Sequence, residues 1–170
     1  MKTFRHATMV ALALAVASMI QAPQVQAGQA SSIATAVGSC QGNLPASDAN
    51  LRKRPLAIRN EGLSNAFISC STQSGYRPVA VYAAILAVTN LNTVAVELSC
   101  TLVDGPLPVL ASYYPRTVSV EPNIASVIVW QPSDYGIPSF TGSENFSCNL
   151  PPGVEINIVG FGYESDTSAP

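Results

Sequence analysis

The chain has 170 residues, with ten acidic and eight basic side chains and a net charge of −2. Hydrophobic residues make up 48% of it, which suffices for the core of about one domain. A weakly acidic chain offers no general attraction to nucleic acid, so we expect no nucleic-acid partner.

Residues 1–27 have the features of a secretory signal peptide. Two basic residues precede an apolar run over 9–20, which is too short to span a membrane. Small residues predict cleavage after Ala27; cleavage after Ala22 is the less favoured alternative, because Pro23 would then adjoin the cut. We therefore expect a secreted or periplasmic protein without a membrane span.

The sequence beyond residue 27 has no periodic pattern at first and then a repeated succession of short strands. We expect a flexible lead-in over 28–37 and a single β-sandwich domain over 38–170. Apolar and polar residues alternate in 94–102, 116–121, 144–150 and 153–158, which predicts strands buried on one side. The inward-facing residues would be Val94, Val96, Leu98, Cys100 and Leu102 in the first, Phe146, Cys148 and Leu150 in the third, and Val154, Ile156 and Ile158 in the fourth.

Turn residues separate these runs at 60–62, 90–92, 121–123 and 151–153. This spacing predicts an all-β fold, an antiparallel two-sheet sandwich of about eight strands, immunoglobulin-like or jelly-roll-like. Segment 79–90 is apolar on every face; we favour a central strand, and a buried helix is the alternative. No internal repeat is evident.

The four cysteines predict two disulfides, because an even number in an exported protein is typically paired. Three pairings are open. Cys100 and Cys148 both fall on apolar strand faces and can meet in the core, so Cys40 and Cys70 would pair by elimination.

The chemistry available to the exported chain is limited, because its one histidine lies within the predicted signal peptide. No histidine-based triad or metal site can form, so we expect no enzyme, no cofactor and no metal. A catalytic carboxylate pair is the weak remaining option. Asp48 and Asn50 could hold calcium, but a turn cap is the favoured interpretation.

The stretch 51–60 concentrates basic residues at Arg52, Lys53, Arg54 and Arg59. Side-chain parity predicts a strand from Pro55, with Leu56 and Ile58 on its core face and the basic triplet at the rim. There Arg54 would pair with a carboxylate or bond loop carbonyls; a ligand site is the alternative.

Aromatic residues supply a second set of candidates. Tyr113, Tyr114 and Trp130 could stack on sugar rings, although the parity of Trp130 with Ile128 favours core packing. The candidate ligand surface therefore comprises Tyr113, Tyr114, Trp130, Arg52 and Arg54.

Residues 40–71 contain a cysteine, the run Leu-Arg-Lys-Arg-Pro-Leu-Ala-Ile-Arg-Asn and a final Ile-Ser-Cys-Ser. This order resembles a group of small uncharacterised secreted proteins of proteobacteria. The resemblance covers the first third of the chain and implies a β-sandwich in a Gram-negative envelope or outside the cell. It implies no activity.

We therefore expect an exported, non-enzymatic β-sandwich with a structural or interaction role. The alternative is a carbohydrate-binding module, based on the aromatic residues. A third hypothesis is a polyanion binder acting through residues 51–60. A protein or a glycan is the candidate partner.

If Arg54 is a rim anchor, Arg54→Ala should lower the melting temperature more than Lys53→Ala. Differential scanning calorimetry of the two variants tests this. Equal and negligible effects would favour a ligand site in this stretch.

Overall fold

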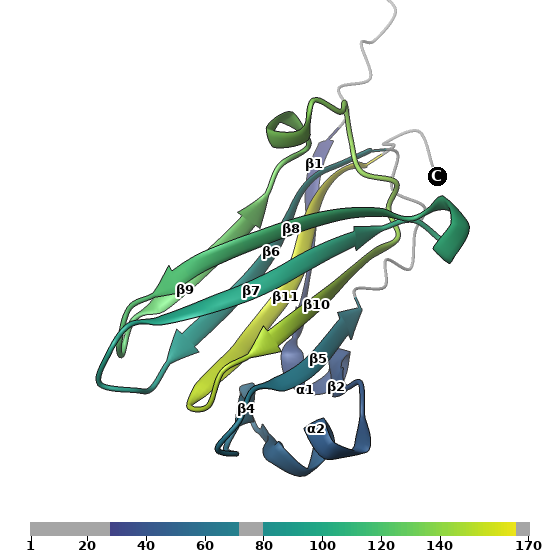
Figure 1. Cartoon of the computed structure of the whole chain (residues 1–170). Helices are drawn as coiled ribbons and strands as arrows, with labels where there is room; N and C mark the ends of the chain where they lie inside the picture. The colour runs from purple at the N-terminus through teal and green to yellow at the C-terminus, as the bar shows by residue number, and fades with distance from the viewer. Residues whose placement is uncertain (1–27, 72–79, 166–170) are drawn as a thin grey trace, which may run out of the picture.

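The structure is a computed structural model, and it describes residues 28–71 and 80–165. The predicted signal peptide lies outside these residues. The described chain forms eleven strands in two antiparallel sheets that pack face to face (Figure 1). The predicted β-sandwich is therefore confirmed, with more strands than expected.

Sheet A has the strand order β3-β4-β11-β6-β9, and β1 pairs with the part of β11 beyond β4. Its strands are β1 (Gly28–Thr35), β3 (Leu51–Arg54), β4 (Ala57–Asn60), β6 (Ala80–Asn90), β9 (Ala125–Trp130) and β11 (Val154–Ser165). The segment predicted as a central strand is β6, which lies between β11 and β9 and confirms that prediction.

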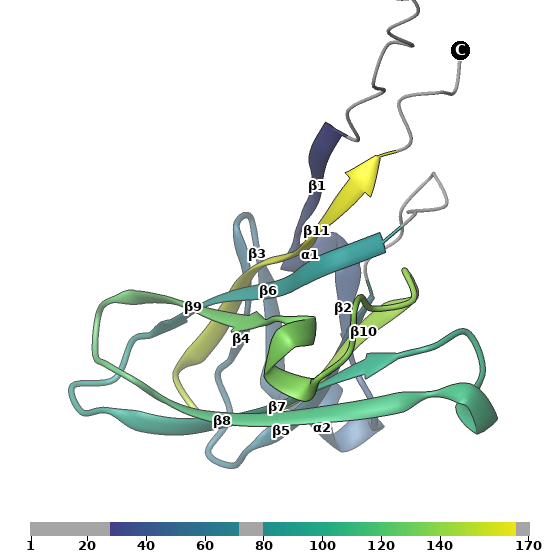
Figure 2. The ribbon, with the colours of Figure 1, turned by 90° about the horizontal axis from the view of Figure 1, so that it is seen from above.

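Sheet B has the order β2-β5-β10-β7-β8. Its strands are β2 (Cys40–Gly42), β5 (Ala66–Ser71), β7 (Val96–Asp104), β8 (Ser112–Val120) and β10 (Glu144–Leu150). Short helices occupy the connections: α1 (Ala36–Ser39), α2 (Pro45–Asn50), η1 (Pro108–Leu110) and η2 (Pro132–Tyr135). Seen from above, the two sheets form separate layers (Figure 2).

The core lies between the sheets and follows the predicted alternation in most places. In β10 the residues Phe146, Cys148 and Leu150 are buried, and β7 buries Leu98 with its neighbours of the same parity. Trp130 is 0% exposed. Its Nε1 donates a hydrogen bond of 2.9 Å to the backbone carbonyl of Tyr114, so the one polar atom of a large core ring is satisfied across the sheets.

Both predicted disulfides are confirmed, and both lie within sheet B. Cys40 stands directly opposite Cys70 in the β2–β5 pair, with a Cα–Cα distance of 4.0 Å. Cys100 stands opposite Cys148 in the β7–β10 pair, at 4.1 Å. The disulfides therefore fasten neighbouring strands of one sheet rather than joining the sheets.

At one end of the sandwich, here called the crossover end, loops 61–65, 91–95, 121–124 and 151–153 pass between the sheets (Figure 1). Asn60 ends a strand of sheet A and is 0% exposed. Its Nδ2 donates to the carbonyls of Leu150 in sheet B and Ser64 in its own loop, at 2.8 and 2.9 Å. Its Oδ1 accepts the amide of Gly62 at 2.9 Å.

Asn90 repeats this arrangement at the end of β6. Its Nδ2 donates to the carbonyls of Val120 and Val94, both at 2.8 Å, and its Oδ1 accepts the amide of Asn92 at 3.0 Å. The interval from each asparagine to the next Ser-Cys pair is also the same in β4–β5 and β6–β7. The two strand-loop-strand units, each of which passes from sheet A to sheet B, are thus built alike, a repeat that the sequence analysis did not detect.

Three details of the sequence analysis are corrected by the structure. Residues 28–35, expected to be an irregular lead-in, pair along their length with β11 as strand β1. A bulge between Ile156 and Ile158 shifts the alternation of β11, so Val159 rather than Ile158 faces the core. Val94 lies in a loop and is exposed.

The prediction that a strand begins at Pro55 is also wrong. Residues 51–54 form strand β3, which turns at Pro55 and Leu56 and pairs back onto β4. Leu56 is exposed in this turn, and only Ile58 of the predicted pair is buried. The basic triplet therefore lies on an edge strand.

The asparagine bonds predict a clear effect on stability. Asn60→Ala should lower the free energy of unfolding by about 3 kcal/mol, because it leaves buried backbone groups unsatisfied. Asn65→Ala, in the same loop but exposed, is the matched control and should have little effect. Chemical denaturation measures both, and equal losses would contradict the role of Asn60.

Candidate functional site

The five candidate ligand residues lie on different surfaces. Trp130 is in the core, and Tyr114 faces inward with its ring 4.5 Å from that of Tyr135. Tyr113 is 61% exposed on the outer side of sheet B. Arg52 and Arg54 lie on β3 of sheet A. The structure therefore does not assemble these residues into one site.

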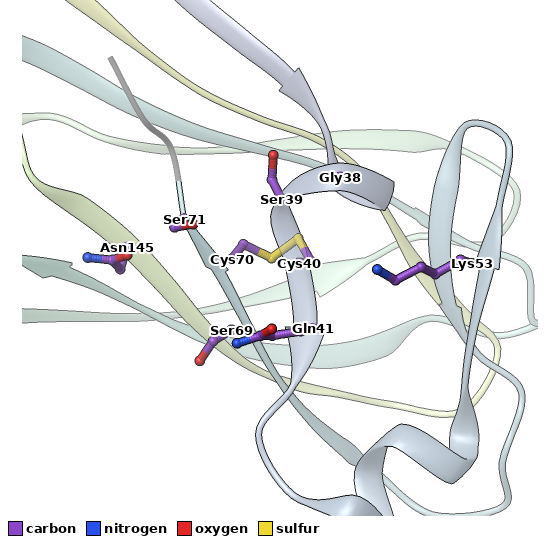
Figure 3. Close-up of a pocket in the computed structure, with 9 residues that line it drawn as sticks. All are labelled: Gly38, Ser39, Cys40, Gln41, Lys53, Ser69, Cys70, Ser71 and Asn145. Atoms are coloured by element: carbon purple, nitrogen blue, oxygen red, sulfur yellow. A yellow bond between two sulfur atoms is a disulfide. The ribbon is translucent and has the colours of Figure 1, made fainter. Parts of the chain in front are cut away.

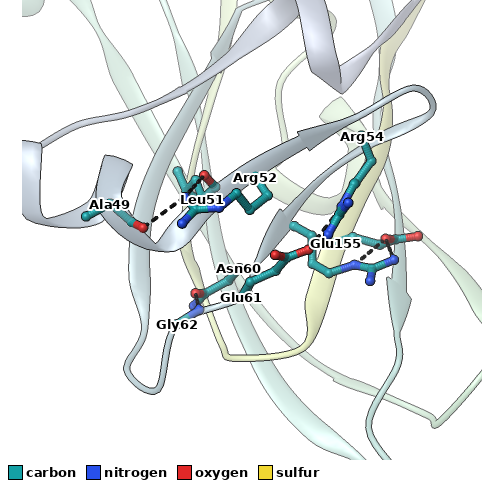
Figure 4. Close-up of polar contacts among 9 residues, drawn as sticks. Ala49, Leu51, Arg52, Arg54, Asn60, Glu61, Gly62 and Glu155 are labelled. Carbon is teal, nitrogen blue, oxygen red and sulfur yellow. Dashed lines mark hydrogen bonds and ion pairs between the residues drawn. The ribbon is translucent and has the colours of Figure 1, made fainter.

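The arginines of the basic stretch bind groups of the protein itself (Figure 4). Arg52 Nη1 donates to the carbonyls of Ala49 and Leu51, at 3.0 and 3.1 Å. Arg54 forms an ion pair with Glu61, and its hydrogen bond is the main cause that lowers the pKa of that carboxyl. These contacts support the rim-anchor interpretation.

Arg59 is held in the same way. Its Nε and Nη2 donate to Oε2 of Glu155 at 2.9 and 2.8 Å, across the β4–β11 pair. Within residues 28–71 and 80–165, Lys53 is the one basic side chain that makes no hydrogen bond or ion pair.

The outer side of sheet B carries a broad set of hydroxyl and amide side chains, here called the polar face. Its members are at least partly exposed on alternate positions of five neighbouring strands. They are Gln41, Ser69, Ser71, Ser99, Thr101, Thr117, Asn145, Ser147 and Asn149.

The strand register arranges these side chains in rows across the sheet. One row runs from Ser71 through Asn145 and Val103 to Tyr113. The next contains Ser69, Ser147 and Thr101. Ser99 and Thr117 share a hydrogen bond of 2.9 Å. The other members make no side-chain hydrogen bond within the described residues, so their donors and acceptors are available to a ligand.

Two adjoining depressions hollow the polar face. The first, of about 460 Å³, lies between the face and loop 105–111, and its wall includes Tyr113, Leu107 and Pro108. The second, of about 280 Å³, lies over the Cys40–Cys70 disulfide (Figure 3). Both depressions are lined by Ser69 and Asn145, so they adjoin on one surface.

Loop 105–111 closes tightly beside the first depression. Gly105 has a φ of +138°, which residues with a side chain rarely adopt. A Cβ there would also lie 2.7 Å from the carbonyl oxygen of Leu110. The tight closure presents apolar side chains of the loop at the border of the polar face.

A carboxylate pair lies at the end of sheet B opposite the crossover end. Asp104 and Glu144 stand opposite each other in β7 and β10, are nearly fully buried, and face the interior. Asp104 accepts hydrogen bonds from the amide and hydroxyl of Thr141, and Glu144 accepts one from the amide of Gly142. Burial raises the pKa of Glu144 to about 7, and the neighbouring Asp104 adds to the rise.

The weak calcium candidate has a structural role in this protein. Asp48 Oδ1 accepts the backbone amide of Gly42 at 3.0 Å, which fixes the chain between β2 and α2. Among residues 28–71 and 80–165, no group of three or more His, Cys, Asp or Glu side chains could hold a metal ion. No helix in this part of the chain is long and apolar enough to cross a membrane.

The polar face was missed by sequence reasoning because serine, threonine and asparagine on the outer side of a strand are unremarkable one by one. Of the residues on that side, only Tyr113 was among the predicted ligand residues. The available signal was the uncharged polar residue at every outward position of β10, which are Asn145, Ser147 and Asn149.

No family model and no curated protein sequence matches the chain. Solved structures match its fold. A family two carbohydrate esterase from Cellvibrio japonicus has a TM-score of 0.51 and 9% identity, with 84% of this chain covering 36% of that one. The C-terminal family 22 carbohydrate binding module of Clostridium thermocellum Xyn10B has a TM-score of 0.41 and 14% identity, covering 85% and 89% of the two chains.

A third match is TmCBM61, solved with beta-1,4-galactotriose, with a TM-score of 0.39, 13% identity and coverage of 79% and 88%. At 9% identity, the match with a TM-score of 0.51 bears on the fold alone. The chain spans about a third of the esterase, so that match concerns a part of a larger protein.

The raised pKa of Glu144 predicts how stability depends on pH. A folded-state pKa of about 7, above the ordinary 4.5, means that the protonated form favours folding. The contribution of protonated Glu144 to the free energy of unfolding is complete below pH 4.5. It is lost as the pH rises through 7, a change of about 3 kcal/mol.

Denaturant unfolding of the wild type and of Glu144→Gln at pH 5 and pH 8 tests this prediction. Comparing the two proteins separates the contribution of Glu144 to stability from that of carboxyls with a lowered pKa, such as Glu61. The stability contributed by a carboxyl of that kind is lost as the pH falls. The wild type should lose more stability between the two pH values than the variant does. The same change in both proteins would contradict the assignment.

Proposed function

We propose that this protein is an exported glycan-binding module that acts without catalysis through the polar face of sheet B. The observation that carries the proposal is the face itself, with unbonded hydroxyls and amides in two adjoining depressions bordered by Tyr113. This favours the carbohydrate-binding alternative over a purely structural role.

The chemistry of the face suits a neutral, hydroxyl-rich ligand. A sugar hydroxyl both donates and accepts, and so do the serine and threonine hydroxyls and the amides of Asn145 and Gln41. Tyr113 and the apolar side chains of loop 105–111 offer surfaces on which the C–H face of a sugar ring can pack. Apolar contact with a few oriented polar groups is typical of small-molecule sites.

The size of the face favours an oligosaccharide over a single sugar. Five strands about 4.8 Å apart extend roughly 19 Å from β8 to β2. The depressions follow the same direction, from Tyr113 on β8 to Gln41 on β2. A chain of several sugars lying across the strands would therefore contact both depressions.

The buried position of the carboxylate pair supports a binding role. Asp104 and Glu144 face the interior, whereas the polar face is on the other side of the same strands. Glycoside hydrolysis needs two carboxyls on either side of a bound sugar. The one carboxyl on the outer side of β7 is Glu97, which lies toward the crossover end.

Export is supported by the two disulfides, which persist mainly in oxidising compartments such as the periplasm and the exterior of the cell. A wider interaction role would use the outer side of sheet A, where Ile33 and Val127 are exposed. Polar side chains described on that surface, such as Thr89 and Asn157, which bond each other at 2.9 Å, are already engaged within the protein.

Binding to immobilised and soluble oligosaccharides, measured by glycan array and calorimetry, tests the proposal. Asn145→Ala and Tyr113→Ala should each weaken binding about tenfold, because one removes hydrogen bonds and the other a packing surface. The matched controls are Asn65→Ala at the crossover end and Val127→Ala on sheet A, which should bind as the wild type does. No binding to any glycan, or equal losses in the controls, would contradict the proposal.

A further inference from the structure

Among the residues that the structure describes, the second depression is lined by a lysine and neutral groups, with no carboxylate. It is lined by Gly38, Ser39, Cys40, Gln41, Lys53, Ser69, Cys70, Ser71 and Asn145. The side chain of Lys53 points from the β3–β4 hairpin toward the Cys40–Cys70 disulfide that forms part of the lining (Figure 3). A cation from sheet A thus borders the edge of sheet B.

The register of β3 explains why Lys53 differs from its neighbours. Successive residues of a strand point to opposite sides, so Lys53 shares the side of Leu51, which is buried. Arg52 and Arg54 point the other way and bind carbonyls and Glu61. Lys53 lies two residues beyond Leu51 on the same side of β3, where the core ends. Its side chain therefore reaches the second depression, which residues of β2 also line.

Lys53 is also the described basic residue whose charge is not used by the protein. Arg54, Arg59 and Arg116 are each paired with a carboxylate, and Arg52 binds two carbonyls. An ammonium group that has no partner in the described part of the chain, beside hydroxyls and amides that can donate hydrogen bonds, is suited to an anionic oxygen group.

The position of this group relative to the polar face defines what ligand it fits. Ser69 and Asn145 line both depressions, so a glycan on the face leads directly to Lys53. The carboxylate of Glu97 lies on the same side of sheet B but toward the crossover end, away from the row that contains Asn145. Negative charge on a ligand would thus meet Lys53 and avoid Glu97.

We propose that Lys53 and the second depression form a subsite for the anionic group of an acidic glycan, such as the carboxylate of a uronic acid. This inference depends on the proposed glycan-binding function and specifies its ligand class. The neutral sugars of the chain would occupy the first depression, and the acidic unit would lie over the disulfide. A sulfate ester offers the same chemistry.

The experiment compares oligouronides with their carboxyl-reduced counterparts, which differ only in the charged group, and with a sulfated oligosaccharide. Calorimetry at low salt should show that the wild type binds the acidic form about tenfold more tightly. Lys53→Gln should remove this preference, because it removes the charge that distinguishes the acidic form from the reduced form. Arg54→Gln, the matched control from the same strand, should keep the preference. Rising salt should weaken it through screening.

The outcomes separate the two proposals. Equal affinity for acidic and reduced forms, or a preference that survives in Lys53→Gln, would overturn the subsite and leave glycan binding in place. Tight binding of the sulfated oligosaccharide that is lost in Lys53→Gln would support an anion subsite that recognises charge rather than a carboxylate alone. Failure of every oligosaccharide to bind would overturn both proposals.

Discussion

The two buried asparagine amides at the crossover end are the interaction on which the sandwich depends. Each amide uses both of its Nδ2 hydrogens and its Oδ1, so nothing polar is left unsatisfied when it is buried. Asn60 and Asn90 lie in sheet A and bond carbonyls at the ends of sheet B strands. The sheets are therefore held at a fixed offset by directional bonds, whereas the hydrophobic core between them is not directional.

Different contacts therefore hold different parts of the fold together. The asparagines join the sheets, and the disulfides fasten β2 to β5 and β7 to β10 within sheet B. These contacts lie at the crossover end and within sheet B, whereas the hydroxyls and amides of the polar face lie on the outer side of sheet B. Its hydroxyls and amides can remain unbonded in the free protein, and a ligand would meet a surface that is already in place.

Much of this fold could be predicted because a strand has a period of two. The alternation alone placed Cys100 and Cys148 on inner faces and so predicted both disulfides. The prediction failed where tertiary contacts override the local pattern. Residues 28–35 become a strand only because β11 pairs with them, and the bulge near Asn157 changes which residues of β11 face inward. The burial of Asn60 could not be predicted, because an asparagine before a turn is common and the sequence does not show whether its amide is buried or exposed.

The candidate site was harder to predict because conspicuous residues serve the fold. Trp130 fills the core, and Arg54 pairs with Glu61. The groups left for a ligand are those that the protein does not use, and only the register of five strands shows that they are neighbours. Lys53 illustrates this: in the sequence it is the middle of a basic triplet, but strand alternation turns it to the opposite side. A charge that has no partner among residues 28–71 and 80–165, and that faces a polar depression, distinguishes a candidate binding residue from an anchor of the hairpin.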